Sequence, residues 1–228
     1  YLTRCQYMLQ QGKFVADVIY FFGEGAPLNV KDTKLNLPPG YDYDVCSEDV
    51  LQQMQARDGK IILPSGMSYN YLLLPNNDRL TLSAVIKIEE LIKSGAKVIA
   101  QKRLVGTPGL SDYPEGDDKV IQIANELWGK GKIITESNWE KIFQTDNLQP
   151  DFIGSGINYI HRKTDREDIY FIANPEQEVI ELKCSFKVSG KIPELWNPDT
   201  GMIKELTDYE ISDGYLTLPI RFEPLESW

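Results

Sequence analysis

Only one histidine, His161, occurs among the 228 residues of the chain. A metal site built from several histidines is therefore excluded, and a Ser-His-Asp triad would depend on this residue alone. The three cysteines, Cys5, Cys46 and Cys184, are widely spaced and include no Cys-x-x-Cys pair. They predict buried thiols rather than a zinc site or a disulfide framework.

Basic residues are outnumbered, with 24 Lys and Arg against 34 Asp and Glu and a formal net charge of −10. They form no basic run, and nucleic-acid binding depends on clustered cations that release counterions, so we expect no nucleic-acid partner. The longest apolar run, residues 14–22, is interrupted by Asp17. It is shorter than the roughly 20 residues that cross a bilayer, so we also expect no membrane span.

Apolar residues follow helical and strand periods in alternation as far as Pro150. Thr81 opens the clearest helical pattern, and Gly95 ends it before the next apolar run. Strands that alternate with helices in this way predict an α/β fold with a doubly wound parallel sheet. The expected helices cover 2–11, 47–58, 81–94, 117–128 and 138–145, and the expected strands cover 14–22, 61–63, 71–74, 97–100 and 133–134.

The pattern changes after Pro150. Short segments of mixed alternation follow, separated by turn signals such as Ser189-Gly190 and Asp213-Gly214. They predict a smaller all-β domain of the sandwich type, with strands over 158–164, 168–173, 179–188, 202–206 and 215–222. We therefore predict two domains, an α/β domain over residues 1–150 and a β-sandwich segment over residues 151–228.

The candidate binding residues lie mainly in the long segment after the first expected strand. In an open parallel sheet, ligands bind beyond the carboxyl ends of the strands, and long loops are often functional. This segment is rich in Gly, Pro, Asn and Asp, and its Tyr and Asp residues could stack on a sugar ring and accept hydrogen bonds from its hydroxyl groups. A solvated turn is the structural alternative. The substrate-binding candidates from this segment are Glu24, Tyr41, Asp42 and Asp44.

His161 is the remaining candidate for ligand binding, on a probable strand with Arg162 facing the opposite way. A hydrogen-bonded structural histidine is the alternative interpretation. Other chemistry finds no support in the sequence, which contains no phosphate-binding glycine loop followed by Lys-Ser or Lys-Thr and no G-x-S-x-G elbow. No acid has the signs of the paired carboxylates of a glycosidase, and we assign no catalytic and no metal-binding residue.

Several motifs together resemble one known family. The first runs from Arg4 to Lys13 and into Val15-Ala16-Asp17-Val18, and others are residues 40–44 and Tyr113-Pro114. The later ones are His161-Arg162-Lys163-Thr164, Asp168-Ile169-Tyr170-Phe171, Asn174, Pro193-Glu194-Leu195-Trp196-Asn197-Pro198 and Thr200-Gly201. Over nearly the whole chain, the sequence resembles the region that follows the catalytic barrel in the α-L-rhamnosidases of glycoside hydrolase family 106.

The resemblance implies an accessory region of a larger enzyme that hydrolyses terminal α-L-rhamnosides of polysaccharides. Its α/β part resembles the flavodoxin-like, class I glutamine-amidotransferase-like domains of such hydrolases. In the family, the catalytic glutamates belong to the barrel, here expected upstream of Tyr1, so the chain alone should be inactive. The resemblance also implies calcium in the parent enzyme, carbohydrate and the barrel as partners, and a periplasmic or extracellular location.

Two other interpretations stay open at this point. The chain could be a noncatalytic carbohydrate-binding or oligomerisation module. It could also be a stand-alone amidotransferase-like hydrolase, although the missing nucleophile elbow counts against this interpretation.

Overall fold

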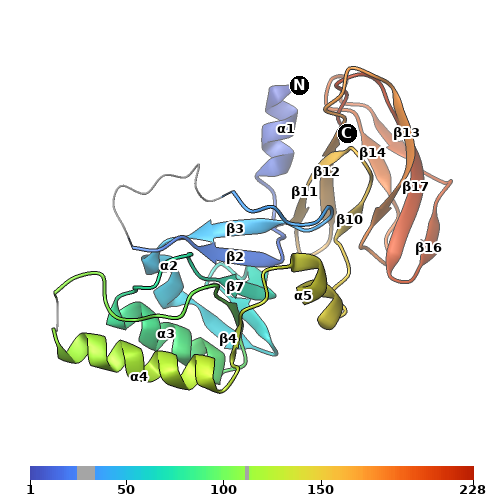
Figure 1. Cartoon of the computed structure of the whole chain (residues 1–228). Coiled ribbons are helices and arrows are strands. Elements are labelled where there is room, and N and C mark those ends of the chain that lie inside the picture. The colour runs from blue at the N-terminus through green and yellow to red at the C-terminus, as the bar shows by residue number, and fades with distance from the viewer. Residues whose placement is uncertain (25–33, 111–112) are drawn as a thin grey trace. The chain divides into compact units, whose positions relative to one another are not determined.

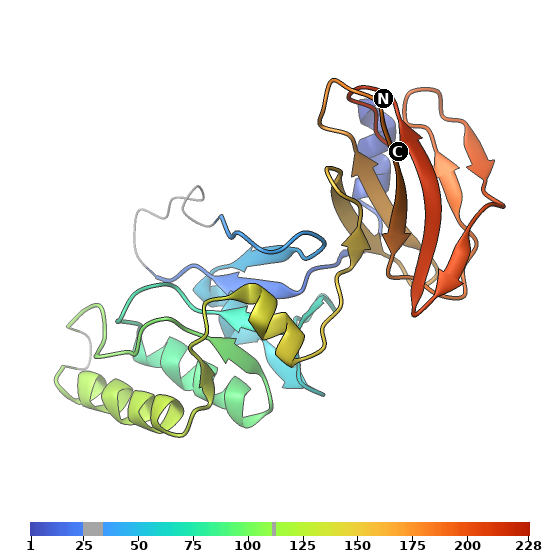
Figure 2. The same ribbon diagram turned by 45° about the vertical axis from the view of Figure 1, so that its right-hand side comes forward.

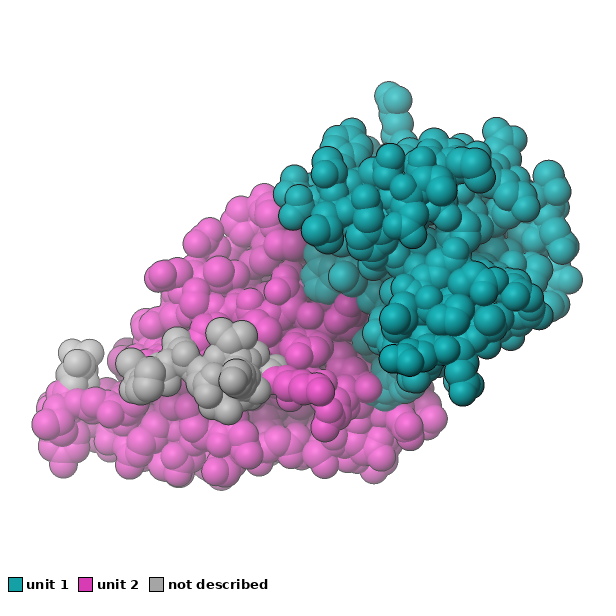
Figure 3. Space-filling view, turned by 90° about the horizontal axis from the view of Figure 1, so that it is seen from above, with its two compact units in different colours: residues 1–15, 38–41, 148–228 teal, residues 16–37, 42–147 magenta. Residues whose placement is uncertain are grey.

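The computed structural model describes residues 1–24, 34–110 and 113–228. The chain forms two compact units, coloured separately in Figure 3. The parallel-sheet unit consists of Ala16–Leu37 and Asp42–Asn147, and the antiparallel unit consists of Tyr1–Val15, Pro38–Tyr41 and Leu148–Trp228. Neither unit is continuous in sequence, whereas the sequence pattern predicted one boundary near Pro150.

The parallel sheet predicted from the alternating pattern is present. Five strands lie in the order β3-β2-β7-β8-β9, and all four neighbouring pairs are parallel. The central strands are almost wholly buried, as expected for a sheet whose residues are apolar on both faces. The strands are β2 (Val18–Phe21), β3 (Tyr43–Cys46), β7 (Tyr71–Leu73), β8 (Lys97–Ile99) and β9 (Ile133–Ile134).

Helices connect these strands, and side chains cap the starts of two of them. The Thr81 hydroxyl accepts a hydrogen bond from the Ala84 N–H at the start of α3 (Leu82–Lys93), and Asn138 caps α5 (Trp139–Thr145) in the same way. Figures 1 and 2 both show α3 beside α4 (Glu115–Gly129). The unit also contains α2 (Glu48–Gln53) and a small antiparallel sheet of β4 (Gln55–Arg57), β5 (Lys60–Ile62) and β6 (Ser68–Tyr69).

The prediction of one strand over residues 14–22 is wrong. The chain forms β1 (Lys13–Phe14) in the antiparallel unit and β2 in the parallel sheet, with a break at Asp17. The Asp17 carbonyl accepts hydrogen bonds from the N–H groups of Asn70 and Tyr71, and its carboxylate accepts one from the Asn70 side chain. Asp17 therefore fixes the start of β2, and the strand is not continuous with β1.

The antiparallel unit contains three sheets. A three-stranded sheet has the order β1-β11-β12, a four-stranded sheet has the order β10-β13-β17-β16, and β14 pairs with β15. Strands β13 and β17 form the longest ladder, from Ile180 opposite Phe222 to Phe186 opposite Leu216. The strands are β10 (Phe152–Ile153), β11 (Asn158–Lys163), β12 (Asp168–Ala173), β13 (Ile180–Phe186), β14 (Glu194–Trp196), β15 (Ile203–Glu205), β16 (Glu210–Ser212) and β17 (Tyr215–Phe222).

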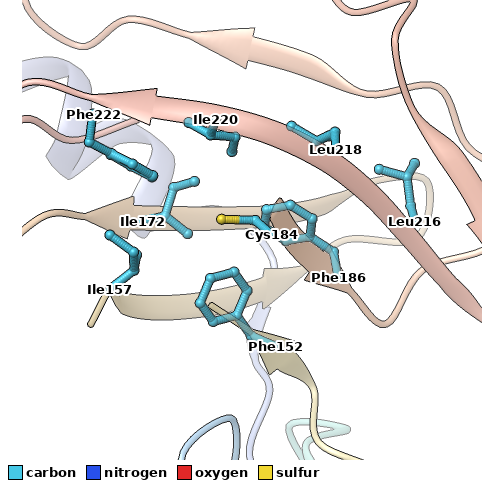
Figure 4. Packing of buried hydrophobic residues seen from close by; sticks show 9 residues of the cluster. All are labelled: Phe152, Ile157, Ile172, Cys184, Phe186, Leu216, Leu218, Ile220 and Phe222. Atoms are coloured by element: carbon cyan, nitrogen blue, oxygen red, sulfur yellow. The ribbon is translucent and has the colours of Figure 1, made fainter. Parts of the chain in front are cut away.

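One cluster of buried side chains forms the core of the antiparallel unit (Figure 4). Alternate residues of β17 point into it, which is the period-two pattern of a strand with one buried face. Strands β10, β12 and β13 supply residues from both larger sheets, so this core joins the two sheets. The cluster consists of Phe152, Ile157, Ile172, Cys184, Phe186, Leu216, Leu218, Ile220 and Phe222.

The first fifteen residues belong to the antiparallel unit because specific contacts hold them there. Helix α1 (Leu2–Leu9) is followed by β1, whose Lys13 and Phe14 pair with Lys163 and Arg162 of β11. The Arg162 guanidinium also donates hydrogen bonds to the Gln11 and Gly12 carbonyls, at 2.6 and 2.8 Å. These long-range contacts have no periodic signature in the sequence.

In the described part of the chain, no helix is both long enough and apolar enough to cross a membrane.

Gly12 is required at the close approach between β1 and the end of β11. Its φ is +58°, and a Cβ there would lie 2.3 Å from the Lys163 carbonyl oxygen. We expect Gly12→Ala to lower the free energy of unfolding by about 3 kcal/mol or more, since a backbone clash is added to left-handed strain of about 1–2 kcal/mol. Gly190→Ala is the matched control, because φ is +70° and nothing lies within 4 Å of the added Cβ. Equal losses in urea unfolding would contradict the clash.

Candidate functional site

The five residues predicted to bind substrate are divided between the two units. Tyr41 and His161 belong to the antiparallel unit, and Glu24, Asp42 and Asp44 belong to the parallel-sheet unit. The remainder of the predicted binding segment, residues 25–33, lies outside the described residues. The structure therefore offers two polar clusters, one around His161 and one around Glu24.

His161 lies between two aspartates inside the antiparallel unit. Its Nδ1 is 2.9 Å from Asp151 Oδ2, and its Nε2 is 3.0 Å from Asp168 Oδ1. The His161 side chain is 4% exposed, and the carboxylates of Asp151 and Asp168 are 14% and 6% exposed. Because a carboxylate only accepts hydrogen bonds, this geometry fits an imidazolium that donates from both nitrogens.

The charges of this cluster stabilise that protonation state. Burial alone would lower the pKa of His161, but the hydrogen bonds and charges of Asp151 and Asp168 outweigh burial and raise it. Burial opposes ionisation of Asp168, yet hydrogen bonds from His161 and Lys191 hold its pKa well below the usual range. Lys163 lies 3.4 Å from the same carboxylate. The cluster is therefore a partly buried network of paired charges.

Tyr170 completes the enclosure of His161. The two rings stack with centroids 4.0 Å apart and planes 13° apart, and the Tyr170 hydroxyl donates a hydrogen bond to Asp151 at 3.1 Å. Burial, followed by the charge of Asp151, raises the pKa of Tyr170 far above its usual range. With both nitrogens engaged and one ring face covered, His161 fits the structural alternative better than a ligand contact.

Glu24 lies just beyond the carboxyl end of β2, at the edge of the parallel sheet where ligands of α/β proteins bind. Its carboxylate accepts hydrogen bonds from the Thr81 N–H, at 2.8 Å, and from the Thr81 hydroxyl. Glu48, at the start of α2, accepts a hydrogen bond from the Ser83 hydroxyl at 2.9 Å and lies 3.5 Å from the Thr81 hydroxyl. Thr81 thus connects two carboxyl groups.

This proximity affects the ionisation of Glu24. Burial raises the pKa of Glu24, and the neighbouring Glu48 raises it further, while the hydrogen bonds from Thr81 act in the opposite direction. A partly buried carboxyl group beside a second one could hold a proton or accept hydrogen bonds from the hydroxyl groups of a ligand. Among the sequence-predicted residues, Glu24 has the environment closest to that of a functional acid.

The other three candidates make hydrogen bonds within their own units. Asp42 and Asp44 accept hydrogen bonds from the N–H groups of the residues that follow them, each at 2.8 Å, and Asp44 also accepts one from the Tyr69 hydroxyl at 2.9 Å. The Tyr41 hydroxyl donates to the Leu148 carbonyl at 2.8 Å. These bonds organise β3 and the segment Pro38–Tyr41 that precedes it, as in a structured turn.

Sequence reasoning missed the partners of both clusters. Asp151 and Asp168 contact the ring nitrogens of His161, and Lys191 contacts Asp168. Glu48 contacts the Ser83 and Thr81 hydroxyls, and Thr81 in turn contacts Glu24. The one available signal was the position of Glu48 and Thr81 at predicted helix starts beside the carboxyl edge of the sheet. Among the described residues, no group of three or more His, Cys, Asp or Glu side chains is arranged to hold a metal ion.

Comparison with known sequences shows that the chain is similar to carbohydrate-active enzymes. A family model described as alpha-L-rhamnosidase matches residues 1–211. A curated protein of Formosa agariphila, named "Putative beta-glucuronidase", is 41% identical over 231 residues. The alignment covers 97% of this chain but only 19% of the length of that protein. The chain is therefore similar to a small part of a much longer glycosidase-like protein.

Solved structures agree with this result. The rhamnosidase from Novosphingobium sp. PP1Y superposes with a TM-score of 0.83 at 31% identity, covering 96% of this chain and 23% of that one. Alpha-L-fucosidase isoenzyme 2 from Paenibacillus thiaminolyticus gives a TM-score of 0.52 at 10% identity, covering 99% of this chain and 50% of that one. The second likeness concerns the fold alone.

The His161 cluster predicts a specific pH dependence of stability. Because the folded pKa is raised, the stabilisation is complete below pH 6.5 or so, the ordinary histidine pKa, and is lost as the pH rises through the folded pKa. His161→Leu should remove this slope and cost about 3–5 kcal/mol at pH 6, because two aspartates lose their buried partner. Urea unfolding between pH 5.5 and 9 measures both effects.

Asp165→Asn, in the exposed turn between β11 and β12, is the control for a change of charge. It should keep the wild-type slope. Identical slopes for the wild type and His161→Leu would contradict the imidazolium assignment.

Two substitutions of Glu24 separate its charge from its hydrogen bonds. Glu24→Gln keeps an acceptor for the Thr81 N–H and removes the charge whose burial raises the pKa, so at pH 8 it should be at least as stable as the wild type. Glu24→Ala removes the acceptor as well and should lose about 1 kcal/mol. Thermal unfolding compares the two variants, and equal losses would show that the charge itself stabilises the fold.

Proposed function

The chain belongs to the α-L-rhamnosidase family, and from this membership we propose that it is a noncatalytic accessory region of a larger glycoside hydrolase, the parent enzyme. The proposed activity of the parent is hydrolysis of terminal α-L-rhamnosides of polysaccharides. The observation that carries the proposal is coverage, because the chain aligns along nearly its whole length with only 19% of the curated relative and 23% of the solved rhamnosidase. The partners would be the catalytic barrel of the same polypeptide and a carbohydrate.

The environments of the acids support a noncatalytic role. Glycoside hydrolysis uses two carboxyl groups flanking the scissile bond, roughly 5 to 10 Å apart, one of them with a raised pKa. Asp44, Asp151 and Asp168 instead accept hydrogen bonds from side chains of their own unit. Glu24 is hydrogen-bonded to the start of α3. We therefore place the catalytic acids of the parent outside this chain.

A flavodoxin-like, amidotransferase-like origin is proposed for the parallel-sheet unit. Counted in chain order, its strands lie as 2-1-3-4-5, the order found in flavodoxin-like sheets. A thiol-dependent hydrolase is nevertheless disfavoured. Burial raises the pKa of Cys46 and of Cys184 to about 12, with the charge of Asp44 contributing at Cys46, so both are protonated at neutral pH and poorly nucleophilic. Cys5 is buried as well.

Calcium and location are proposals for the parent alone. Among the residues that the structure describes, no three or more His, Cys, Asp or Glu side chains are grouped to hold a metal ion, so we assign none of them to a calcium site. A periplasmic or extracellular location suits an enzyme that degrades polysaccharides.

The antiparallel unit is proposed as a β-sandwich, supported by the shared core of its two larger sheets.

Activity measurements on two proteins test this proposal. The parent enzyme and the isolated 228-residue chain are assayed with p-nitrophenyl α-L-rhamnopyranoside and p-nitrophenyl β-D-glucuronide. We expect the parent to release nitrophenol from the rhamnoside and the isolated chain to release none from either. Turnover by the isolated chain would overturn the accessory role. A parent that cleaves only the glucuronide would retain the accessory role and refute the rhamnoside assignment.

A further inference from the structure

The β14–β15 hairpin of the antiparallel unit displays an apolar face flanked by acids. Trp196 pairs directly with Ile203, and Glu194 pairs directly with Glu205. Directly opposite residues of an antiparallel pair lie on the same face, so these four side chains share one face, the platform face. Leu195 and Lys204 lie on the other face.

The platform face is exposed to solvent. Trp196 is 43% exposed and Ile203 is 54% exposed, although both are large apolar side chains. All three residues of β15 are exposed, and the hairpin forms a sheet of only two strands. Such a pair is marginally stable in isolation, so its persistence requires other contacts.

Those contacts come from the turn and from α1. The Asn197 side chain accepts hydrogen bonds from the N–H groups of Asp199 and Thr200, both at 2.9 Å. Arg4 of α1 donates to the carbonyls of Pro198 and Asp199, also at 2.9 Å. These bonds hold the hairpin in one conformation without using the platform face.

The orientation of the indole ring is fixed as well. Trp196 Nε1 donates a hydrogen bond to Glu194 Oε2 at 2.8 Å. The only polar atom of the side chain is thus satisfied within the platform face, and the ring remains partly open to solvent. An aromatic ring held in place before binding loses little entropy when a ligand stacks on it.

The chemistry of the platform face selects one class of ligand. An aromatic face carries negative charge density and attracts the polarised C–H groups of a sugar ring. The neighbouring Glu194 and Glu205 carboxylates accept hydrogen bonds but donate none, so the ligand must supply donors, as the hydroxyl groups of a sugar do. Two carboxylates repel an anionic sugar. The matching ligand is a neutral pyranose.

We propose that the platform face binds a neutral pyranose unit of a glycan, with Trp196 as the stacking surface and Glu194 and Glu205 as hydroxyl acceptors. This site rests on the proposed function, since a region of a polysaccharide-degrading enzyme meets glycans as its substrate. It is separate from the sequence-predicted candidates, because none of its residues is among them.

Saturation-transfer NMR on the 228-residue chain tests the site. The probes are the methyl glycosides of α-L-rhamnose, β-D-galactose and β-D-glucose, with methyl β-D-glucuronide as the anionic counterpart. We expect transfer to the ring C–H protons of at least one neutral sugar, about fivefold weaker in Trp196→Ala, which is the size of one aromatic stacking contact. Trp196→Phe should retain part of the signal, and Tyr7→Ala, which removes another exposed aromatic side chain of the same unit, should retain all of it.

Several results would overturn the site: no transfer to any neutral sugar, equal transfer in Trp196→Ala, or transfer to the glucuronide as strong as to the neutral sugars. Preferential binding of Nα-acetyl-lysine methyl ester would also overturn it, in favour of a cationic partner. Any of these results would overturn the sugar site without contradicting the proposed function, provided that the parent enzyme cleaves the rhamnoside. If the parent enzyme does not cleave the rhamnoside but the chain binds a neutral sugar through Trp196, the rhamnoside assignment is refuted and the sugar site stands.

Discussion

The antiparallel unit depends on one buried interaction, the pairing of the His161 ring with the carboxylates of Asp151 and Asp168. These residues come from the segment before β10, from β11 and from the start of β12, so one ring connects three parts of the unit. A cation is needed at this position because each ring nitrogen faces a carboxylate oxygen. An apolar side chain would leave the two acids without their common partner, and a neutral imidazole could donate to only one of them.

The same connectivity explains why the two units are not continuous in sequence. The N-terminal fifteen residues are held by pairing of β1 with β11, the strand that carries His161. The chain then leaves for the parallel sheet at Asp17, whose backbone and carboxylate contact Asn70 and Tyr71. Each unit therefore needs segments that are distant in sequence, and strand pairing of this kind forms only after long loops close.

The sequence predicts what is local and leaves the rest open. Thr81 could be recognised as the start of a helix, and the parallel sheet follows from the alternation of elements, because helix starts and periodicity involve neighbouring residues. The break at Asp17 could not be predicted, since it depends on contacts with residues more than 50 positions away. His161 could be identified as unusual, but its position between Asp151 and Asp168 could not be predicted, because strand pairing and packing bring these three residues together and leave no periodic pattern in the sequence.

The distribution of satisfied and exposed groups separates structural from functional residues in this chain. A group that binds a ligand must leave some hydrogen-bonding capacity or apolar area open in the free protein. The nitrogens of His161 and the hydroxyl of Tyr41 are engaged within their unit, so their polarity is used in folding. Trp196 shows the opposite arrangement, because its one polar atom is satisfied while its ring is partly exposed on a braced hairpin. His161 and Tyr41, which suggested chemistry in the sequence, thus use their polar atoms within the fold. The exposed ring belongs instead to Trp196, whose sequence context suggested only family resemblance.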